Sequence, residues 1–283
     1  MTRPSGRERW GRAVALTIAG SDSSAGAGIQ ADLKTFQAIG VYGTTAITAL
    51  TAQNTLGVRA VQESTPEIVA AQIDAVAEDL GVDGAKTGML ASEAIVHAVA
   101  ERVRRWDIGR VLVVDPVSVA KGGDRLLSES ALRVVVRELL PLAAVVTPNL
   151  PEAAAILGRT VADDDDEIAR AARELRELGP RAVVIKGGHR AGRARDVYVD
   201  GHTEEIFDAE RSPTKDTHGT GCTFSAAIAA RIALGDDLVD AVRYAKAFVT
   251  RAIERARPLG AGHGPLAHEP LAAEERVARG RAS

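Results

Sequence analysis

The sequence predicts an α/β protein with three layers, an α/β/α sandwich around a mostly parallel central sheet. Short β-rich runs alternate with stretches of helical periodicity along most of the 283 residues, and such alternation produces parallel strands joined by crossover helices. Hydrophobic residues make up 46% of the chain but aromatic residues only 3%, so small aliphatic side chains must build the interior. Functional side chains are then expected at the carboxyl ends of the strands.

The spacing of apolar residues predicts most of the strands and helices. Buried strands are expected at residues 13–19, 84–87, 111–115, 144–147 and 182–186. Helices are expected at residues 66–80, 92–105, 128–139 and 163–178, with Ser92 and Ser128 as N-caps. The acidic run at residues 163–166 could suggest a metal site, but negative charge also favours a helix N-terminus, which is the interpretation we prefer.

The last third of the chain adds a hairpin and two helices. Asp200-Gly201 between two apolar runs predicts a β-hairpin over residues 196–207, which could form an edge of the sheet. Helical runs follow at residues 223–234 and 238–257. No internal repeat or low-complexity linker divides the chain, so we expect one domain. Its predicted range is 13–268, between a flexible N-terminal tail, 1–12, and a charged C-terminal tail, 269–283.

The composition of the chain limits the kinds of molecule that it is expected to bind. The net charge is -3 and no basic block occurs, which argues against nucleic-acid or membrane-surface binding. Small molecules are therefore the expected partners. One cysteine excludes an internal disulfide, and no apolar run approaches the roughly 18 residues that span a bilayer. Residues 1–12 are polar and basic, unlike a secretory signal, so a cytoplasmic protein is expected.

Residues 216–222, Asp-Thr-His-Gly-Thr-Gly-Cys, form the most informative motif. Its two glycines allow close approach of the backbone to a ligand, and the helix that follows turns unpaired N–H groups toward the same place. Such a helix N-terminus favours a phosphoryl group in transfer, and it would also favour a thiolate at Cys222. The alternative is a glycine turn before an ordinary buried helix, with the cysteine as a small core residue.

A second glycine-rich turn, residues 20–28, follows the first expected strand and leads into a helix. Gly26-x-Gly28-x-x-Ala31 matches a variant of the dinucleotide fingerprint, but no acidic residue lies between Asp32 and Glu63 to hold a ribose. A Walker A sequence is also absent. We therefore expect a different ligand at this turn.

Polar residues near this turn could face a small heterocycle. Asp22, Asp32 and Gln53 together offer carboxylate and amide groups that would recognise an amine and a ring nitrogen. The alternative is structural: Asp32 complements a helix N-terminus and Gln53 caps a strand. The sequence alone leaves both interpretations of these residues open.

Oxygen ligands and a cation follow later strands. Asp115 ends one expected strand, and Asn149 and Glu152 follow the next, a set that suits Mg²⁺ with nucleotide phosphates. Asn149 with Glu152 also resembles a helix-capping arrangement. Lys186 ends a further strand beside two glycines, where it could contact phosphates or lie in a surface turn.

Taken in order, these segments resemble the hydroxymethylpyrimidine/phosphomethylpyrimidine kinase family of thiamin biosynthesis, within the ribokinase-like superfamily. The resemblance is carried by residues 15–22, 49–55, 86–90, the Asp115 strand, 147–152, 186–189, 218–222 and 262–266. It implies ATP-dependent phosphorylation of 4-amino-5-hydroxymethyl-2-methylpyrimidine and then of its monophosphate. It also implies a homodimer, to which the 197–207 hairpin could contribute, and it allows a monovalent cation near the last motif.

The resemblance assigns roles by position. The pyrimidine would be held by Gly20, Asp32 and Gln53, with Met89 and Val117 as apolar walls. Mg²⁺ would be bound by Asp115 and Glu152, and ATP by Lys186, Thr217 and Asn149. The catalytic residues would be Gly219, Thr220, Gly221 and Cys222. Many ribokinase-like relatives carry an aspartate base where this chain has Cys222, which would act either as a thiolate base or by positioning the hydroxyl.

Three other functions compete with this hypothesis. A pyridoxal kinase of the same superfamily phosphorylates a similar flat alcohol, although Gln53 favours the aminopyrimidine. A noncatalytic sensor would keep the fold without phosphoryl transfer. A dinucleotide oxidoreductase is the weakest, because the ribose-binding acid is missing.

Overall fold

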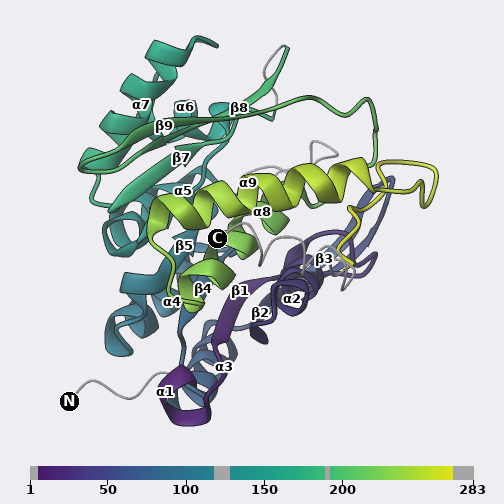
Figure 1. Ribbon diagram of the computed structural model, residues 1–283. Coiled ribbons are helices and arrows are strands. Elements are labelled where there is room, and N and C mark those ends of the chain that lie inside the picture. Colours follow the sequence, from purple (N-terminus) through teal and green to yellow (C-terminus); the bar gives the residue numbers. More distant parts are fainter. Residues whose placement is uncertain (1–5, 118–127, 189–191, 270–283) are drawn as a thin grey trace.

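A computed structural model of the protein describes residues 6–117, 128–188 and 192–269. Within them nine strands form one sheet in the order β3-β2-β1-β4-β5-β6-β7-β8-β9 (Figure 1). The strands are β1 Val14–Asp22, β2 Tyr42–Asn54, β3 Gly57–Glu63, β4 Gly84–Thr87, β5 Leu112–Val114, β6 Val145–Val146, β7 Ala182–Ile185, β8 Ala194–Val199 and β9 Glu204–Ala209. The six neighbouring strands β2, β1, β4, β5, β6 and β7 pair in parallel. The strands β3, β8 and β9 pair antiparallel with their neighbours. The predicted mostly parallel sheet is confirmed.

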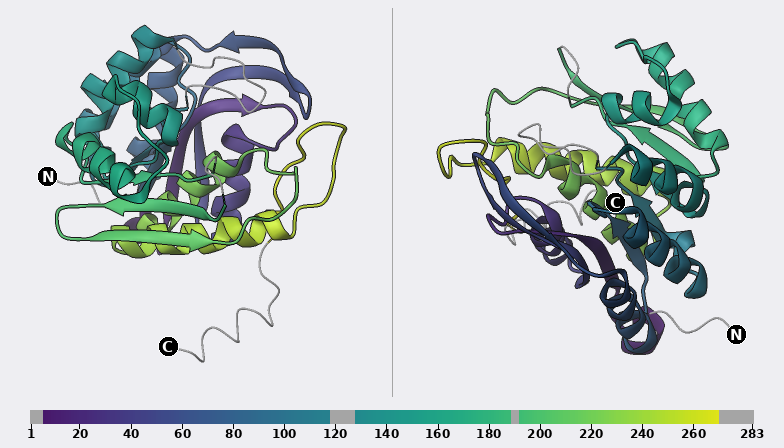
Figure 2. Two further views of the ribbon diagram at one scale, coloured as in Figure 1. Left: turned by 90° about the horizontal axis from the view of Figure 1, so that it is seen from above. Right: turned by 180° about the vertical axis from the view of Figure 1, so that it is seen from behind.

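Helices cover both faces of this sheet (Figures 1 and 2). They are α1 Gly6–Trp10, α2 Gly28–Ile39, α3 Pro66–Asp79, α4 Glu93–Arg105, α5 Glu129–Val134, α6 Leu150–Leu157, α7 Asp165–Glu177, α8 Thr220–Ala233 and α9 Leu238–Glu254. Short helical turns lie at Ile108–Val111, Val135–Leu139 and Leu140–Leu142. The three-layer α/β/α class is therefore confirmed.

The two faces of the sheet have separate cores. On one face α2, α8 and α9 bury their apolar residues with Val113 of β5, and on the other α3, α4 and α5 pack with Leu112 and Val114. Adjacent residues of a strand point to opposite faces, so one short strand supplies both cores. The helices α6 and α7 cover β7 and β8 in a third cluster. These cores fix the strand ends that carry the site.

Several local predictions are confirmed with small changes. Ser128 accepts a hydrogen bond from Ala131 N at 3.1 Å as the N-cap of α5. Ser92 occupies the N-cap position of α4, but its side chain makes no capping bond. The acidic run does begin a helix, because Asp164 accepts from Asp166 N and Glu167 N at the start of α7.

The expected hairpin forms β8 and β9, and β9 is an edge of the sheet as predicted. Its turn is wider than Asp200-Gly201, because Asp200 Oδ1 accepts from both His202 N and Thr203 N. The sequence analysis did not predict β2 and β3. Every residue of β3 is exposed or half-buried, so this edge strand lacks the apolar run by which the other strands were recognised.

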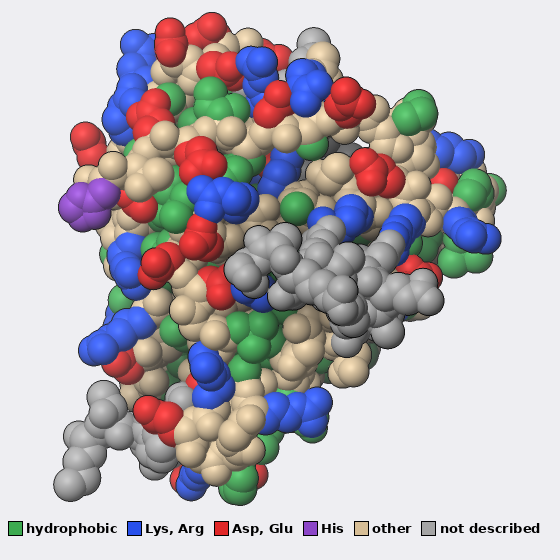
Figure 3. Space-filling view, in the orientation of Figure 1, with side chains coloured by type: hydrophobic (Ala, Val, Ile, Leu, Met, Phe, Trp, Pro, Cys, Tyr) green, Lys and Arg blue, Asp and Glu red, His purple; other side chains and the backbone are tan. Residues whose placement is uncertain are grey.

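Part of the segment expected to be a tail is ordered against the domain. Residues Gly6–Trp10 form α1, and Arg7 N donates to Asp83 Oδ2 at 3.1 Å. The division into one domain with two tails remains a prediction, and residues 270–283 lie outside the described ranges. No helix within those ranges is long and apolar enough to cross a membrane. Basic and acidic side chains are interspersed on the face shown in Figure 3.

Candidate active site

The carboxyl ends of the central parallel strands and the N-terminus of α8 meet at one edge of the sheet. Asp115 follows β5, Thr147 follows β6 and Lys186 follows β7. Gly221, in the first turn of α8, lies against them, because a Cβ built on it would be 3.3 Å from Lys186 Nζ and 3.7 Å from Asp115 Oδ2. Motif 216–222 thus lies at the strand ends where functional side chains were expected.

Lys186 and Asp115 form an ion pair at this edge. Lys186 Nζ lies 2.8 Å from Asp115 Oδ1, and Thr147 Oγ1 donates to the same oxygen at 3.3 Å. The Lys186 side chain is 15% exposed and that of Asp115 only 2%. Burial lowers the pKa of Lys186, but Asp115 and Glu152 raise it above its ordinary value. The lysine is thus a fixed positive charge beside Gly221.

Asn149 and Glu152 form the capping box that the sequence left open as an alternative. Asn149 Oδ1 accepts from Glu152 N at 2.9 Å, and Glu152 Oε2 accepts from Asn149 N at 2.8 Å at the start of α6. Their roles toward nucleotide and metal remain predictions. Among the described residues no three His, Cys, Asp or Glu side chains gather in a metal cluster. Asp115 with Glu152 is a donor set that fits Mg²⁺ when phosphate oxygens complete the coordination.

The glycine motif forms the expected helix N-terminus. Gly219 is the N-cap of α8 with φ +81°, and a Cβ there would lie 1.9 Å from Gly26 O, so only glycine permits this contact between the two glycine-rich turns. The helical ladder starts with Thr223 N donating to Gly219 O at 2.9 Å. The amides of Gly221 and Cys222 precede that first bond, as anion-binding amides do.

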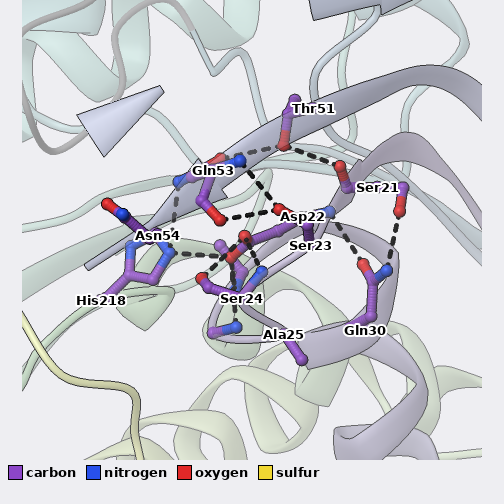
Figure 4. A network of polar contacts seen from close by, with 12 residues as sticks. Ser21, Asp22, Ser23, Ser24, Ala25, Gln30, Thr51, Gln53, Asn54 and His218 are labelled. Atoms are coloured by element: carbon purple, nitrogen blue, oxygen red, sulfur yellow. Dashed lines mark hydrogen bonds and ion pairs between the residues drawn. The ribbon is translucent and has the colours of Figure 1, made fainter. Parts of the chain in front are cut away.

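A histidine joins the same two turns (Figure 4). His218 Nε2 lies 2.9 Å from Asp22 Oδ2, and because an ionised carboxylate only accepts, this nitrogen carries the hydrogen. Asp22 also accepts from Ser24 N, Gly26 N and Ala27 N. Burial raises the pKa of Asp22, but these hydrogen bonds, His218 first, bring it well below its ordinary value. The Asp22 carboxylate, which the sequence analysis considered as one that could face a ligand, therefore holds the turn together.

Gln53 lies at the end of β2 beside this histidine. Its amide nitrogen is 3.3 Å from His218 Nε2, and its backbone N donates to Ser23 Oγ at 2.8 Å. The first glycine-rich turn, the β2 end and motif 216–222 thus converge (Figure 4). A Cβ on Gly20 would lie 3.2 Å from Met89 Cε, which places two further predicted substrate residues in contact.

The remaining predicted residues lie close by. The backbone N of Val117 donates to Asp115 O at 2.8 Å, and this valine is half-buried. Thr220 Oγ1 donates to Thr217 O at 2.7 Å, which stabilises the turn before α8. Their contacts with substrate or nucleotide stay predictions.

Asp32 has a partner that the sequence analysis missed. Lys86 Nζ donates to Asp32 Oδ1 at 3.1 Å and Oδ2 at 2.9 Å, Thr17 Oγ1 donates to Oδ2 at 2.6 Å, and both charged side chains are fully buried. Lys86 belongs to a segment that carries the family resemblance, but no role was assigned to it. A lysine inside an expected buried strand was the available signal, because an unpaired buried ammonium is costly.

Cys222 lies in the first turn of α8, half-buried. Burial raises the pKa of its thiol above the ordinary value, although Lys86 and a backbone hydrogen bond with Gly28 oppose the rise. The sequence analysis expected the helix N-terminus to favour a thiolate. The net upward shift of the pKa favours the protonated thiol instead, because desolvation outweighs the favourable charge and hydrogen bond.

Comparison with known proteins identifies the family of the chain. The fold is that of the ribokinase-like class, as expected. Residues 22–267 match the phosphomethylpyrimidine kinase family, so the chain belongs to that family. It is 52% identical over 259 residues to the hydroxymethylpyrimidine/phosphomethylpyrimidine kinase of Rhizobium meliloti (strain 1021), covering 90% of this chain and 97% of that one.

Two solved structures are similar along most of their length. The phosphomethylpyrimidine kinase of Clostridium difficile 630 is 42% identical with a TM-score of 0.77, covering 86% of this chain and all (100%) of that one. An ADP complex of Bacillus subtilis pyridoxal kinase is 40% identical with a TM-score of 0.84, covering 91% of this chain and 97% of that one. Structural likeness thus extends to both kinases that the sequence analysis weighed.

Proposed function

We propose that this protein transfers a phosphoryl group from ATP to the hydroxymethyl group of 4-amino-5-hydroxymethyl-2-methylpyrimidine, and then to the resulting monophosphate. The observation that carries the proposal is the position of Gly221, which brings the α8 N-terminus against Lys186 and Asp115. A positive charge and helix amides directed at one place suit a phosphoryl group in transfer. The names of the family and of its relatives support the pyrimidine as acceptor.

The nucleotide side of the site is the Lys186 edge. Lys186, Thr217 and Asn149 would contact ATP, and the ADP complex of the Bacillus subtilis relative supports nucleotide binding by this fold. Asp115 and Glu152 would hold Mg²⁺, which when bound neutralises phosphate charge. Because phosphoryl transfer depends on alignment and charge stabilisation, Gly219, Thr220 and Gly221 supply the largest effect through their backbone.

The acceptor side is the first glycine-rich turn. Gly20 and Met89 would form one wall of the substrate site and Val117 another, while Asp32 and Gln53 recognise polar groups of the ring. Cys222 acts as a protonated thiol that positions the alcohol, because burial raises the pKa of its thiol. A monovalent cation near motif 216–222 remains compatible with this arrangement.

Steady-state kinetics with three alcohols test the proposal. ATP consumption is measured with Mg²⁺ and the aminopyrimidine alcohol, its monophosphate, or pyridoxal, and we expect both pyrimidines to be turned over with a kcat/KM above that for pyridoxal. A preference for pyridoxal would make the chain a pyridoxal kinase. No turnover of any alcohol would favour the noncatalytic sensor.

We also propose that the protein is a homodimer. Apolar side chains lie exposed on the β2–β3 side of the sheet, among them Tyr42, Leu50 and Val61, and Ile206 is exposed on the opposite edge strand β9. Exposed apolar groups on edge strands favour association. Light scattering after size-exclusion chromatography gives the mass directly, and the mass of a single chain would contradict the proposal.

A further inference from the structure

A buried carboxylate on β8 contacts the residue that follows Lys186. The side chain of Asp196 is only 8% exposed, and its two oxygens have different partners. Oδ1 accepts from Gly187 N at 2.7 Å, and Oδ2 lies 2.9 Å from Lys246 Nζ of α9. Burying such an ion pair is costly, and the function proposed so far gives Asp196 no part.

The contact with Gly187 takes over where the pairing of β7 with β8 ends. The antiparallel ladder stops with Ile185 opposite Val197, so its register brings Asp196 opposite Lys186 as the next pair. At this point the acceptor for the next N–H group of the chain is a side chain rather than a backbone carbonyl. Gly187 is buried, and a buried N–H group needs an acceptor.

The backbone of Lys186 is thus held on both sides. Its own N–H donates to Pro148 O at 2.8 Å, and the peptide group that it forms with Gly187 donates to Asp196. The carbonyl of Gly187 in turn accepts from Arg211 Nη2 at 3.1 Å. The lysine side chain therefore starts from a fixed backbone, from which its ammonium reaches the N-terminus of α8.

We propose that Asp196 is a positioning residue for nucleotide binding. By fixing the peptide group between Lys186 and Gly187, it holds the Lys186 ammonium toward the phosphates of the nucleotide. This inference rests on the proposed function, which assigns Lys186 to ATP. Asp196 acts through that lysine and does not itself touch the nucleotide, while Lys246 pairs with the buried carboxylate.

Nucleotide affinity in variants of Asp196 tests this role. Kd for ADP is measured by isothermal titration calorimetry, and KM is measured for ATP and for the aminopyrimidine alcohol. In Asp196→Ala the Gly187 N–H loses its acceptor, and we expect Kd for ADP and KM for ATP to rise roughly 10-fold, with KM for the alcohol within about 2-fold. Asp196→Asn keeps a side-chain oxygen for Gly187 N, so both constants should return to within about 3-fold of the wild type.

Two further variants separate positioning from folding. Lys246→Met breaks the same buried pair from the other side and leaves Asp196 beside Gly187. It should lower the free energy of unfolding as Asp196→Ala does, yet keep the wild-type Kd for ADP. The double variant Asp196→Ala/Lys246→Met removes both buried charges together, which costs less stability than removing one. It should show the raised Kd even where Asp196→Ala does not fold.

A double-mutant cycle shows whether Asp196 acts through the lysine. In a Lys186→Met background, Asp196→Ala should change Kd for ADP by less than about 2-fold, because the group that it positions is gone. An effect as large as in the wild-type background would overturn the proposed route.

The remaining outcomes are equally distinct. Asp196→Ala or the double variant with a wild-type Kd for ADP would overturn the role of Asp196, and so would a Lys246→Met variant whose Kd rises as much as that of Asp196→Ala. Wild-type protein that phosphorylates neither pyrimidine would refute the proposed function itself. A raised Kd that follows the loss of the Gly187 acceptor, and not the loss of the ion pair, supports the inference.

Discussion

Two lysine–aspartate pairs lie near Cys222, and they differ in burial and in how they use the carboxylate. The Lys86–Asp32 pair is fully buried, with both carboxylate oxygens bound to the ammonium. The Lys186–Asp115 pair is 15% exposed at the lysine and joins through Oδ1, with Oδ2 directed toward Gly221. The first pair is closed on itself, while the second presents its charges to the α8 N-terminus.

This difference in burial determines what each pair can contact. A closed pair gains little net stability from its charges but fixes one carboxylate in one state, which suits a structural role inside the domain. A pair at an open edge keeps a cation available to phosphate oxygens. Substitutions in the two pairs should therefore show their effects in different measurements.

The largest expected effect is on stability. Lys86→Met leaves Asp32 buried without its cation, and breaking a buried pair from one side costs about 3–5 kcal/mol. Urea denaturation of the variant should show this loss, while Lys186→Met should lose less, because the Lys186 side chain is partly exposed and water can reach the gap that it leaves beside Asp115. Equal losses in the two variants would remove the distinction between the pairs.

The next effect is on turnover. Lys186→Met removes the proposed phosphate cation, and loss of one transition-state donor typically costs about 10²- to 10³-fold in kcat. Initial rates at varied ATP should show this fall with the fold intact by circular dichroism. A variant with wild-type kcat and wild-type KM for ATP would exclude Lys186 from the phosphate site.

A third carboxylate, Asp22, should make the stability of the folded protein depend on pH in the acid range. Its folded pKa lies below the ordinary value of 3.8, so its contribution is fully present above pH 4 and is lost as the pH falls below that value. Asp22→Asn should destabilise the protein by about 1.5–3 kcal/mol at neutral pH, because hydrogen bonds to a charged group are removed.

Thermal unfolding between pH 7 and pH 2 measures the Asp22 effect. The variant should approach the wild type in stability at the acid end of this range. A constant difference at every pH would show that the charge of Asp22 is not what holds the two glycine-rich turns together.

A smaller effect is expected at Gly221. The added Cβ of Gly221→Ala meets Lys186 Nζ at 3.3 Å, a contact that a flexible side chain relieves. Stability should therefore change by less than about 1 kcal/mol, while kcat falls roughly 10-fold because the methyl group enters the space beside the lysine and carboxylate. If the loss of stability in kcal/mol were as large as the rise of the activation free energy, the variant would indicate disrupted packing instead.

The smallest effect is expected at Cys222. The pKa of its thiol lies above the ordinary 9.0, so the group stays protonated up to at least pH 8.5. Cys222→Ala should retain activity within about 10-fold, with a ratio to the wild type that is constant from pH 6 to 8.5. A ratio that worsens as the pH rises would identify a thiolate base.

The sequence predicts those parts of the fold that depend on apolar periodicity. Five buried strands and the capped helices follow from it, and so does the position of Asp115 and Lys186 at the carboxyl ends of parallel strands. Strand β3 was missed because its residues are exposed or half-buried and form no apolar run, and β2 was missed because buried residues alternate with half-buried ones along it. Local pattern carries little information where burial is partial.

The site was harder to predict where side chains pair across distant elements. Lys86 and Asp32 are 54 positions apart, and His218 and Asp22 are 196 apart. Local spacing contains no signal for such pairs, so the sequence could not show that Asp22 binds His218. The direction of the Cys222 pKa shift was likewise set by burial, which the motif alone did not reveal.

A crystal structure with the aminopyrimidine alcohol and a non-hydrolysable ATP analogue tests the central claim most directly. The account predicts γ-phosphate oxygens within hydrogen-bonding distance of the Gly221 and Cys222 amides, with Lys186 on the same phosphate and the alcohol oxygen facing phosphorus. Phosphates bound elsewhere, with those amides bonded to protein atoms, would contradict it.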